Sequence, residues 1–307
     1  MSELIRPSAP FQYSFTVILD YLVYSSVYLS LAAAGMAYLS SVLHDVPCNP
    51  VVLILGMLTT YSVYNLNRKT DENEDVINHS ERYAFTKRYE KTLLATAIGA
   101  YVLALVLSGF YGMAVIIVSA LPLLSGLVYS TPLLPRGFRY RRLKEIPVAK
   151  SLLVAFAWAL PPALLPVYVA GVIPGFITLG VVLFFFSLVF INTVLFDIRD
   201  VVGDRATGVR TIPVCIGIPG TKILLTVVNI SLGLLILGLL AGRIPLTFLA
   251  LILAGMIYAQ GYILLYHRMK AGNLVCDLIA DGQFILLGLC MGILVVIRGT
   301  LPALPLW

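Results

Sequence analysis

The stretch from Pro174 to Asp197 reads PGFITLGVVLFFFSLVFINTVLFD, and it decides the fold class. Its apolar run reaches the roughly 20 residues that a helix needs to cross the hydrocarbon core of a bilayer. A barrel strand would alternate polar and apolar residues, and this run does not, so it predicts a membrane-spanning helix. Asn192 within this run, and Asp20 in the first apolar stretch of the chain, are expected to face the interior of a helical bundle.

The composition of the whole chain agrees with this prediction. Apolar residues make up 60% of the 307 residues, charged residues make up 12%, and the mean hydropathy is +0.96. Soluble domains carry about 25% charged residues, so an integral membrane protein is indicated. The first apolar stretch, from Tyr13 to Leu43, is too long for the core of a signal peptide and has no clear A-x-A cleavage site, so we interpret it as a retained helix.

Charged, proline and glycine residues divide the chain into apolar stretches of membrane-spanning length. They predict an all-α, polytopic membrane protein, in which residues 1–307 form a single integral-membrane domain, a bundle of about nine transmembrane helices. The expected helices are residues 13–43, 51–67, 90–108, 111–129, 148–169, 174–197, 219–241, 244–266 and 277–298.

Positive charges lie almost entirely on one side of these predicted helices. With this helix count, 19 of the 21 Lys and Arg residues lie on the side where the chain begins, and only Arg243 and Arg298 lie on the other side. The positive-inside rule places the basic side in the cytoplasm, which predicts a multi-pass protein of the cell membrane. An error in the helix count between these loops would have mixed the two sides, so the bias supports the count.

The net charge of +6 has two interpretations. Basic loops facing anionic lipid explain it simply, and an electropositive mouth that attracts a phosphorylated substrate is the alternative. Nucleic acid is not an expected partner, because the cations are scattered over short loops. The four cysteines form no C-x-x-C pair and the three histidines lie far apart in sequence, so no redox centre, zinc site or Ser-His-Asp triad is indicated.

Two acidic clusters follow apolar stretches on the predicted cytoplasmic side. Residues four apart lie on one side of a helix, so such residues can point into one cavity. Several carboxylates in a poorly solvated cavity stay ionised only beside a compensating cation, and their hard oxygen donors favour Mg²⁺. A solvated loop is the alternative for the first cluster, and the matching second cluster argues against it. The clusters are Asn67, Asp71 and Asp75, and Asp197, Asp200 and Asp204.

The pairing of the clusters suggests a reaction. Two facing clusters would hold about two or three Mg²⁺ ions, and these would hold a diphosphate. A metal-bound diphosphate is a good leaving group, because the metal stabilises the charge that develops on it. A cavity at the bilayer suits a diphosphate ester of a long apolar chain and keeps water from an allylic carbocation. We therefore expect a prenyl diphosphate donor, such as geranylgeranyl diphosphate, a lipophilic acceptor and the lipid bilayer as partners.

These residues resemble the signatures of a known family. Both acidic clusters, the second with its continuation through Gly208 and Arg210 to Pro213, resemble the two motifs of the UbiA superfamily of intramembrane prenyltransferases. The YSTP segment at residues 129–132, with the basic loop after it, is similar to that family's loop between helices four and five. The resemblance covers nearly the whole chain, and it implies a helical bundle around a central cavity that opens to the cytoplasm.

The resemblance also implies roles for individual residues. Asp71, Asp75, Asp200 and Asp204 would be the catalytic carboxylates, and with Asn67 they would bind Mg²⁺ and the diphosphate. Asp197 either joins them or pairs with a nearby cation. Four basic residues are candidates for contact with the diphosphate by charge and location: Arg82, Lys144, Arg210 and Lys150. For the first three the alternative is an ordinary loop charge. For Lys150 the alternative is that its side chain snorkels to the membrane surface.

The chain departs from the family's pattern after the motif Asn. It has Arg68 where many members have Asp, and NHSERYAF at residues 78–85 where many continue with R-x-x-R-P-L. A further D-x-x-x-D pair, Asp277 and Asp281, begins the last helix; we expect it to pair with a basic loop or line a wet rim rather than to form a third metal cluster.

Several functions compete at this point. For the acceptor, an aromatic quinone precursor is expected first, and the ether-lipid intermediate of a digeranylgeranylglyceryl phosphate synthase is the alternative. A cation transporter would also explain intramembrane carboxylates, but these lie at one edge of the membrane rather than midway. A CDP-alcohol phosphotransferase would need D-G-x-x-A-R, and the sequence after Asp281 does not continue in that way.

Overall fold

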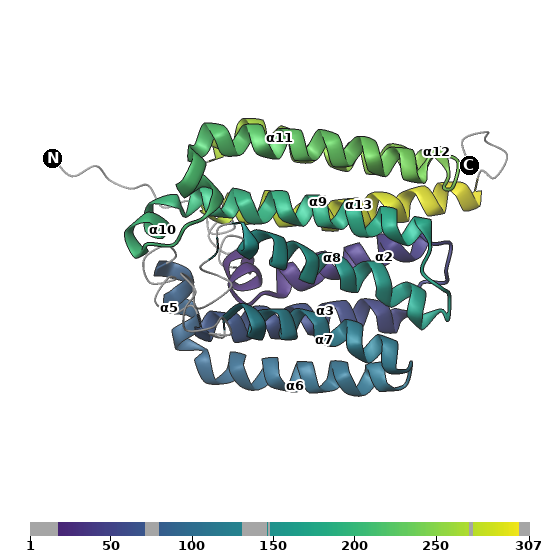
Figure 1. Ribbon diagram of the computed structural model, residues 1–307. Coiled ribbons are helices and arrows are strands. Elements are labelled where there is room, and N and C mark those ends of the chain that lie inside the picture. The colour runs from purple at the N-terminus through teal and green to yellow at the C-terminus, as the bar shows by residue number, and fades with distance from the viewer. Residues whose placement is uncertain (1–17, 71–79, 131–145, 147, 270–272, 301–307) are drawn as a thin grey trace, which may run out of the picture.

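The computed structural model describes residues 18–70, 80–130, 146 and 148–269, with residues 273–300 at the C-terminal end. Every regular element in these ranges is a helix, and the long helices lie side by side in one bundle (Figure 1). Six of them are long and apolar enough to cross a membrane, or seven if the bent first pair counts as one span. The prediction of an all-α, polytopic membrane protein is confirmed.

The helix boundaries follow the predicted stretches closely. Two short helices lie at the acidic motifs: α5 (Ser80–Arg88) follows the first motif, and α10 (Val201–Thr207) contains Asp204 of the second. Gly112, with φ +101°, lies in the turn that separates the third predicted helix from the fourth. The long helices are α2 (Val27–Leu43), α3 (Pro50–Thr70), α6 (Glu90–Gly109), α7 (Met113–Ser130), α8 (Ala149–Val169), α9 (Phe176–Arg199), α11 (Ile212–Leu240), α12 (Leu246–Met269) and α13 (Asn273–Thr300).

The first predicted helix is broken, whereas the sequence suggested one continuous run. A short helix, Ile18–Tyr24, meets α2 at a bend of 69°, with Ser26 between them at φ +66°. Backbone carbonyls at the bend accept hydrogen bonds from α3. The Asn65 amide donates to the Ser25 carbonyl at 3.1 Å, and the Arg68 guanidinium donates to the carbonyls of Tyr24 and Val23. Polar side chains from a neighbouring helix therefore stabilise the bend.

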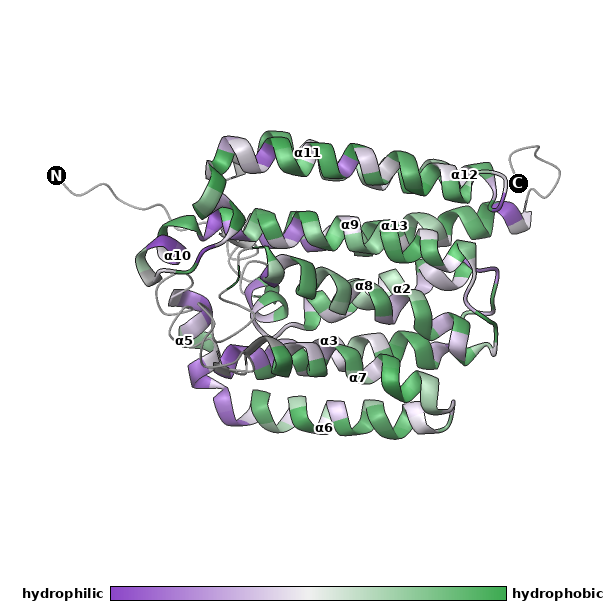
Figure 2. Ribbon diagram, viewed as in Figure 1, coloured by the Kyte–Doolittle hydropathy of each residue, from purple (hydrophilic) through white to green (hydrophobic). Residues whose placement is uncertain are grey.

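The described residues of both acidic motifs lie at the same end of the bundle. The short helices α5 and α10 lie together at one end (Figure 1). Hydrophilic residues gather at that end, while the shafts of the long helices are mainly hydrophobic (Figure 2). This arrangement agrees with the charge bias of the sequence, and it brings the end of α3 and the end of α9 to one level.

The interior of the bundle is organised around α9. Phe184, Phe185 and Leu188 of α9 are fully buried, and α9 packs mainly against α8 and α11. The first and last long helices, α2 and α13, also pack against each other. At their crossing a Cβ atom on Gly288 would lie 2.8 Å from the Cα of Gly35, so only glycine allows this backbone contact.

Candidate active site

Asp197 is buried at the C-terminal end of α9, where two groups from the start of α8 satisfy its carboxylate. The Lys150 ammonium lies 3.1 Å from one oxygen, and the Ser151 hydroxyl donates a hydrogen bond to the other at 3.1 Å. The Asp197 residue is 3% exposed. A buried carboxylate needs such a cation and such donors. Asp197 therefore pairs with a cation that is itself a predicted diphosphate residue, and its own contact with the diphosphate stays a prediction.

Asp200 lies at the junction of α9 and α10, bound by the neighbouring Arg199. The guanidinium donates to both carboxylate oxygens, at 2.9 and 3.1 Å, and also forms an ion pair with Asp277 of α13. The expected pairing of Asp277 with a cation is confirmed. Arg199 therefore connects the second acidic motif to the last helix.

Asp204 lies on α10, outside the membrane-spanning helices. It is 7% exposed, and it accepts a hydrogen bond from the Thr211 hydroxyl at 3.1 Å. Burial raises the pKa of Asp204 to about 6, and the Lys150 charge opposes this shift. An added cation would favour its ionised form, as expected for a metal-binding carboxylate.

A cavity of about 200 Å³ opens beside these carboxylates. Asp197 and Asp200 line it together with Lys150, and apolar side chains of α2, α8 and α9 form much of the remaining wall. Two further polar residues, Asn192 of α9 and Asp281 of α13, reach the same cavity. We call this the carboxylate cavity. The expectation that Asn192 faces the interior of the bundle is confirmed, since it is 3% exposed.

A second cavity of about 190 Å³ lies between α3, α7 and α8. Asn67 of the first motif lines it, and Gly126 of α7 leaves room for the Asn67 amide, whose oxygen would be 3.3 Å from a Cβ atom at that position. We call this the asparagine cavity. It therefore holds the described residue of the first motif, while the carboxylate cavity holds two residues of the second.

The two cavities share a wall. Lys150 and Val154 line both, as do Tyr64 and Trp158, whose ring centroids are 4.9 Å apart. Lys150 is thus the one described cation that reaches both cavities. These aromatic residues and Ser151 were missed in the sequence, because nothing in their local pattern distinguishes them from other membrane-helix residues.

The other predicted basic residues have different positions. Arg82 of α5 is half-buried and lines neither cavity. Arg210, between α10 and α11, is exposed. Asp71, Asp75 and Lys144 lie outside the described residues. Their assignments stay predictions.

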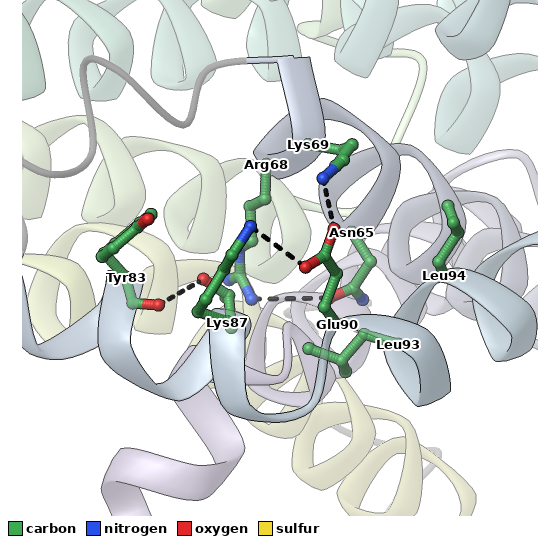
Figure 3. A pocket seen from close by; sticks show the side chains of 9 residues that line it. Asn65, Arg68, Lys69, Tyr83, Lys87, Glu90, Leu93 and Leu94 are labelled. Carbon is green, nitrogen blue, oxygen red and sulfur yellow. Dashed lines mark hydrogen bonds and ion pairs between the residues drawn. The ribbon is translucent and has the colours of Figure 1, made fainter.

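A small charged pocket lies on the outer side of α3, next to the first motif (Figure 3). Glu90 of α6 binds Lys69 and Lys87 there, the latter at 3.1 Å. Arg68 and Asn65 also line the pocket, and both extend to the bend before α2. The charges adjacent to the first motif are therefore largely occupied in holding α3, α5 and α6 together.

The oxygen donors at the cavities fit Mg²⁺, which prefers carboxylate and amide oxygens. In the described part of the chain no three His, Cys, Asp or Glu side chains form a ready-made metal cluster. Asp200 and Asn67 instead lie on two sides of a common wall, in separate cavities. A complete site would have to include the carboxylates predicted at residues 71 and 75.

The chain matches a known family over most of these helices. A family model described as the UbiA prenyltransferase family matches residues 28–276. The chain belongs to the UbiA prenyltransferase family. No curated protein sequence matches it.

Solved structures of UbiA proteins share the fold. A UbiA homologue from Archaeoglobus fulgidus bound to GPP and Mg²⁺ has 14% identity and a TM-score of 0.63, over 88% of this chain and 98% of its own. The apo UbiA homologue from Aeropyrum pernix K1 has 14% identity and a TM-score of 0.65, over 86% and 98%. A digeranylgeranylglyceryl phosphate synthase has 15% identity and a TM-score of 0.57, over 89% and 99%.

Proposed function

We propose that this UbiA protein transfers a prenyl group from a prenyl diphosphate to an electron-rich, lipophilic acceptor, most favourably an aromatic quinone precursor. The observation that carries the proposal is the carboxylate cavity, where Asp197, Asp200 and Lys150 stand at one end of an otherwise largely apolar chamber. The charged end suits a diphosphate and the apolar part suits a prenyl chain. The Archaeoglobus homologue with bound GPP and Mg²⁺ supports this choice of donor.

The proposed binding groups come from both motifs. Asn67, Asp71 and Asp75 would hold Mg²⁺ from one side, with Asp200 and Asp204 on the other, and two or more ions would then bridge these groups to the diphosphate oxygens and stabilise the leaving charge. Lys150 would contact the diphosphate directly, because its ammonium reaches both cavities. Arg82, Lys144 and Arg210 would supply further positive charge around it, and Asp197 would orient Lys150.

The reaction follows from this placement. The bond between C1 of the prenyl chain and the diphosphate oxygen breaks, and its electron pair leaves with the diphosphate. The acceptor then attacks the allylic cation, a new bond to C1 forms, and the acceptor loses a proton. The apolar walls exclude water, which would otherwise capture the cation. The positive-inside rule places the charged end, and so the diphosphate, on the cytoplasmic side of the membrane.

Release of diphosphate from radiolabelled geranylgeranyl diphosphate tests the proposal. The purified protein should release it with Mg²⁺ and a phenolic acceptor, and the alkylated acceptor should appear in equal amount. Asp71→Asn and Asp200→Asn should each lower the rate by at least about 100-fold if they bind the metal that stabilises the leaving group. Asp45→Asn is the matched control, since Asp45 is exposed beyond the far end of α2.

Two results would contradict the proposal. One is full turnover in both motif variants. The other is the absence of diphosphate release together with Asp200-dependent cation flux in vesicles, which would favour the transporter. Geranylgeranylglyceryl phosphate, offered beside the phenolic acceptor, separates the ether-lipid alternative from the quinone-type reaction. The alternative is kept because a digeranylgeranylglyceryl phosphate synthase shares this fold.

A further inference from the structure

A second polar layer lies deeper in the bundle than the acidic motifs. Asn192 of α9 is its centre, and its amide nitrogen donates to the Ala280 carbonyl at 2.8 Å and to the Asp281 carboxylate at 3.4 Å. The Asn192 oxygen accepts hydrogen bonds from the Tyr262 hydroxyl of α12 and from the Gln283 amide of α13. Because these donors fix the orientation of the Asn192 amide, the amide in turn fixes the position of Asp281.

Asp281 has unused capacity to accept hydrogen bonds. A carboxylate offers about four acceptor positions. Within the described part of the chain Asp281 accepts one side-chain hydrogen bond, from Asn192, and has no ion-pair partner. Its remaining surface lines the carboxylate cavity. A polar group held in this way in an otherwise apolar wall requires a hydrogen-bond donor from whatever fills the cavity.

The depth of Asp281 separates it from the proposed diphosphate site. Arg199 binds Asp277 and Asp200, so these two residues mark the level of the second motif. Asp281 is four residues further along α13, about 6 Å deeper in the bundle at 1.5 Å per residue. Asn192 is likewise five residues before Asp197 on α9, again on the deeper side. The layer therefore lies on the side of the cavity where the prenyl chain, and not the diphosphate, would extend.

We propose that Asp281, held in place by Asn192, accepts a hydrogen bond from the hydroxyl group of the acceptor. This inference rests on the proposed transferase function and assigns the acceptor's place within it. C1 of the donor, which the acceptor attacks, lies one bond beyond the diphosphate oxygen. An acceptor held about one helical turn deeper in the bundle than Asp277 and Asp200 would therefore lie beside C1 and not beside the diphosphate. The recognised chemistry is a hydroxyl donor, whether phenolic or on a glycerol lipid.

Binding can be measured without turnover through tryptophan fluorescence. Trp158 lines the same cavity as Asp281, and the other tryptophan is Trp307. In a Trp307→Phe background, 4-hydroxybenzoate should quench Trp158 in a saturable manner, and 4-methoxybenzoate, which lacks the donor, should bind at least about tenfold more weakly. Asp281→Asn should remove this difference between the two probes. Equal affinity of the two probes for the unsubstituted cavity would overturn the inference.

Kinetics provide the second readout, with a matched control. Asp281→Asn and Asn192→Leu should raise the KM for the acceptor about 10- to 100-fold, while the KM for geranylgeranyl diphosphate changes by less than about threefold. Asn229→Leu is the control. Asn229 is also a buried amide, and it donates hydrogen bonds to the Met256 carbonyl and to the Gln260 side-chain oxygen. Unlike Asn192, it lines neither cavity. It should retain both KM values.

The outcomes separate this inference from the proposed function. If the unsubstituted protein releases no diphosphate, the transferase itself is refuted. If it does, and Asp281→Asn alters the KM for the donor or the Mg²⁺ dependence as strongly as that for the acceptor, Asp281 belongs to the metal site and the inference is wrong. The inference also fails if hydroxyl-free acceptors react as well as 4-hydroxybenzoate and geranylgeranylglyceryl phosphate. Asp281→Glu, which keeps the carboxylate, should restore part of the acceptor affinity.

Discussion

The ammonium group of Lys150 lies 3.1 Å from the carboxylate of Asp197, and this ion pair joins the start of α8 to the end of α9. Asp197 is almost fully buried at the end of α9, while Lys150 reaches both cavities from α8. The pair therefore couples the stability of the α8 and α9 contact to the charge that a diphosphate would meet.

Substitution of Lys150 separates these two roles. Lys150→Met leaves the Asp197 carboxylate buried without a cation, and we expect the free energy of unfolding to fall by about 3 kcal/mol. The double variant Lys150→Met with Asp197→Leu removes both charges and should recover most of that loss. Activity should stay low in both variants, because the proposed contact of Lys150 with the diphosphate is missing. Thermal unfolding in detergent and diphosphate release measure the two quantities, and recovery of activity in the double variant would contradict the assigned contact.

Asp204 should make stability depend on pH in the absence of metal. The pKa of Asp204 is about 6 in the folded protein, compared with an ordinary value of about 3.9. Ionisation is therefore harder in the folded state, so the stabilising contribution is complete below about pH 4 and is lost as the pH rises through about 6. In buffer containing a chelator, the unfolding temperature of the unsubstituted protein should fall over this window relative to Asp204→Asn. Parallel pH profiles would show that burial of Asp204 has no such effect.

Gly126 should be required for the position of Asn67. A Cβ atom at this residue would lie 3.3 Å from the Asn67 amide oxygen, so Gly126→Ala pushes that oxygen away from its place in the asparagine cavity. We expect a loss of about 10- to 100-fold in turnover, with little change in unfolding temperature because alanine favours the helix. Gly99→Ala in α6, where no heavy atom lies within 4 Å, is the matched control and should retain full activity. Equal activities of the two variants would contradict this role.

Arg68 should stabilise the bend before α2. Its guanidinium binds the carbonyls of Tyr24 and Val23 at the bend. Arg68→Gln should lower the free energy of unfolding by about 1 to 3 kcal/mol, and Arg68→Asp should lower it further, since a carboxylate would face carbonyl oxygens. Arg88→Gln is the control, because Arg88 is exposed and its guanidinium lies over the ring of Tyr89. Chemical denaturation in detergent provides the measurement.

The contacts of Arg68 also explain a departure from the family's usual sequence. Many members have Asp directly after the motif Asn, and this chain has Arg68. In the structure Arg68 points away from the cavities toward the bend, so the substitution serves the local backbone of this protein. The bend itself could not be predicted, because its hydrogen-bond partners, Asn65 and Arg68, lie about 40 residues away from Ser25 and Tyr24 in sequence.

The sequence predicts features that depend on one helix at a time. The length of each apolar run sets the helix boundaries, and the spacing from Asp197 to Asp200 and Asp204 places them near one end of α9. The contacts that give these residues their function depend on packing between helices. Ser151 meets Asp197 across 46 positions, and Asn192 meets Asp281 across 89, and no local pattern encodes either meeting. The assignments of Asp71, Asp75 and Lys144 stay predictions, since those residues lie outside the described ranges.

The glycine crossing between α2 and α13 has a consequence for biosynthesis. Gly35 and Gly288 bring the first and last long helices into backbone contact, so the ring of helices closes only when the C-terminal segment arrives. A nascent chain that has inserted every earlier helix still lacks the wall that carries Asp281. During translation the chamber is consequently open to lipid on this side until α13 has been inserted, and only then could a reactive cation be sheltered.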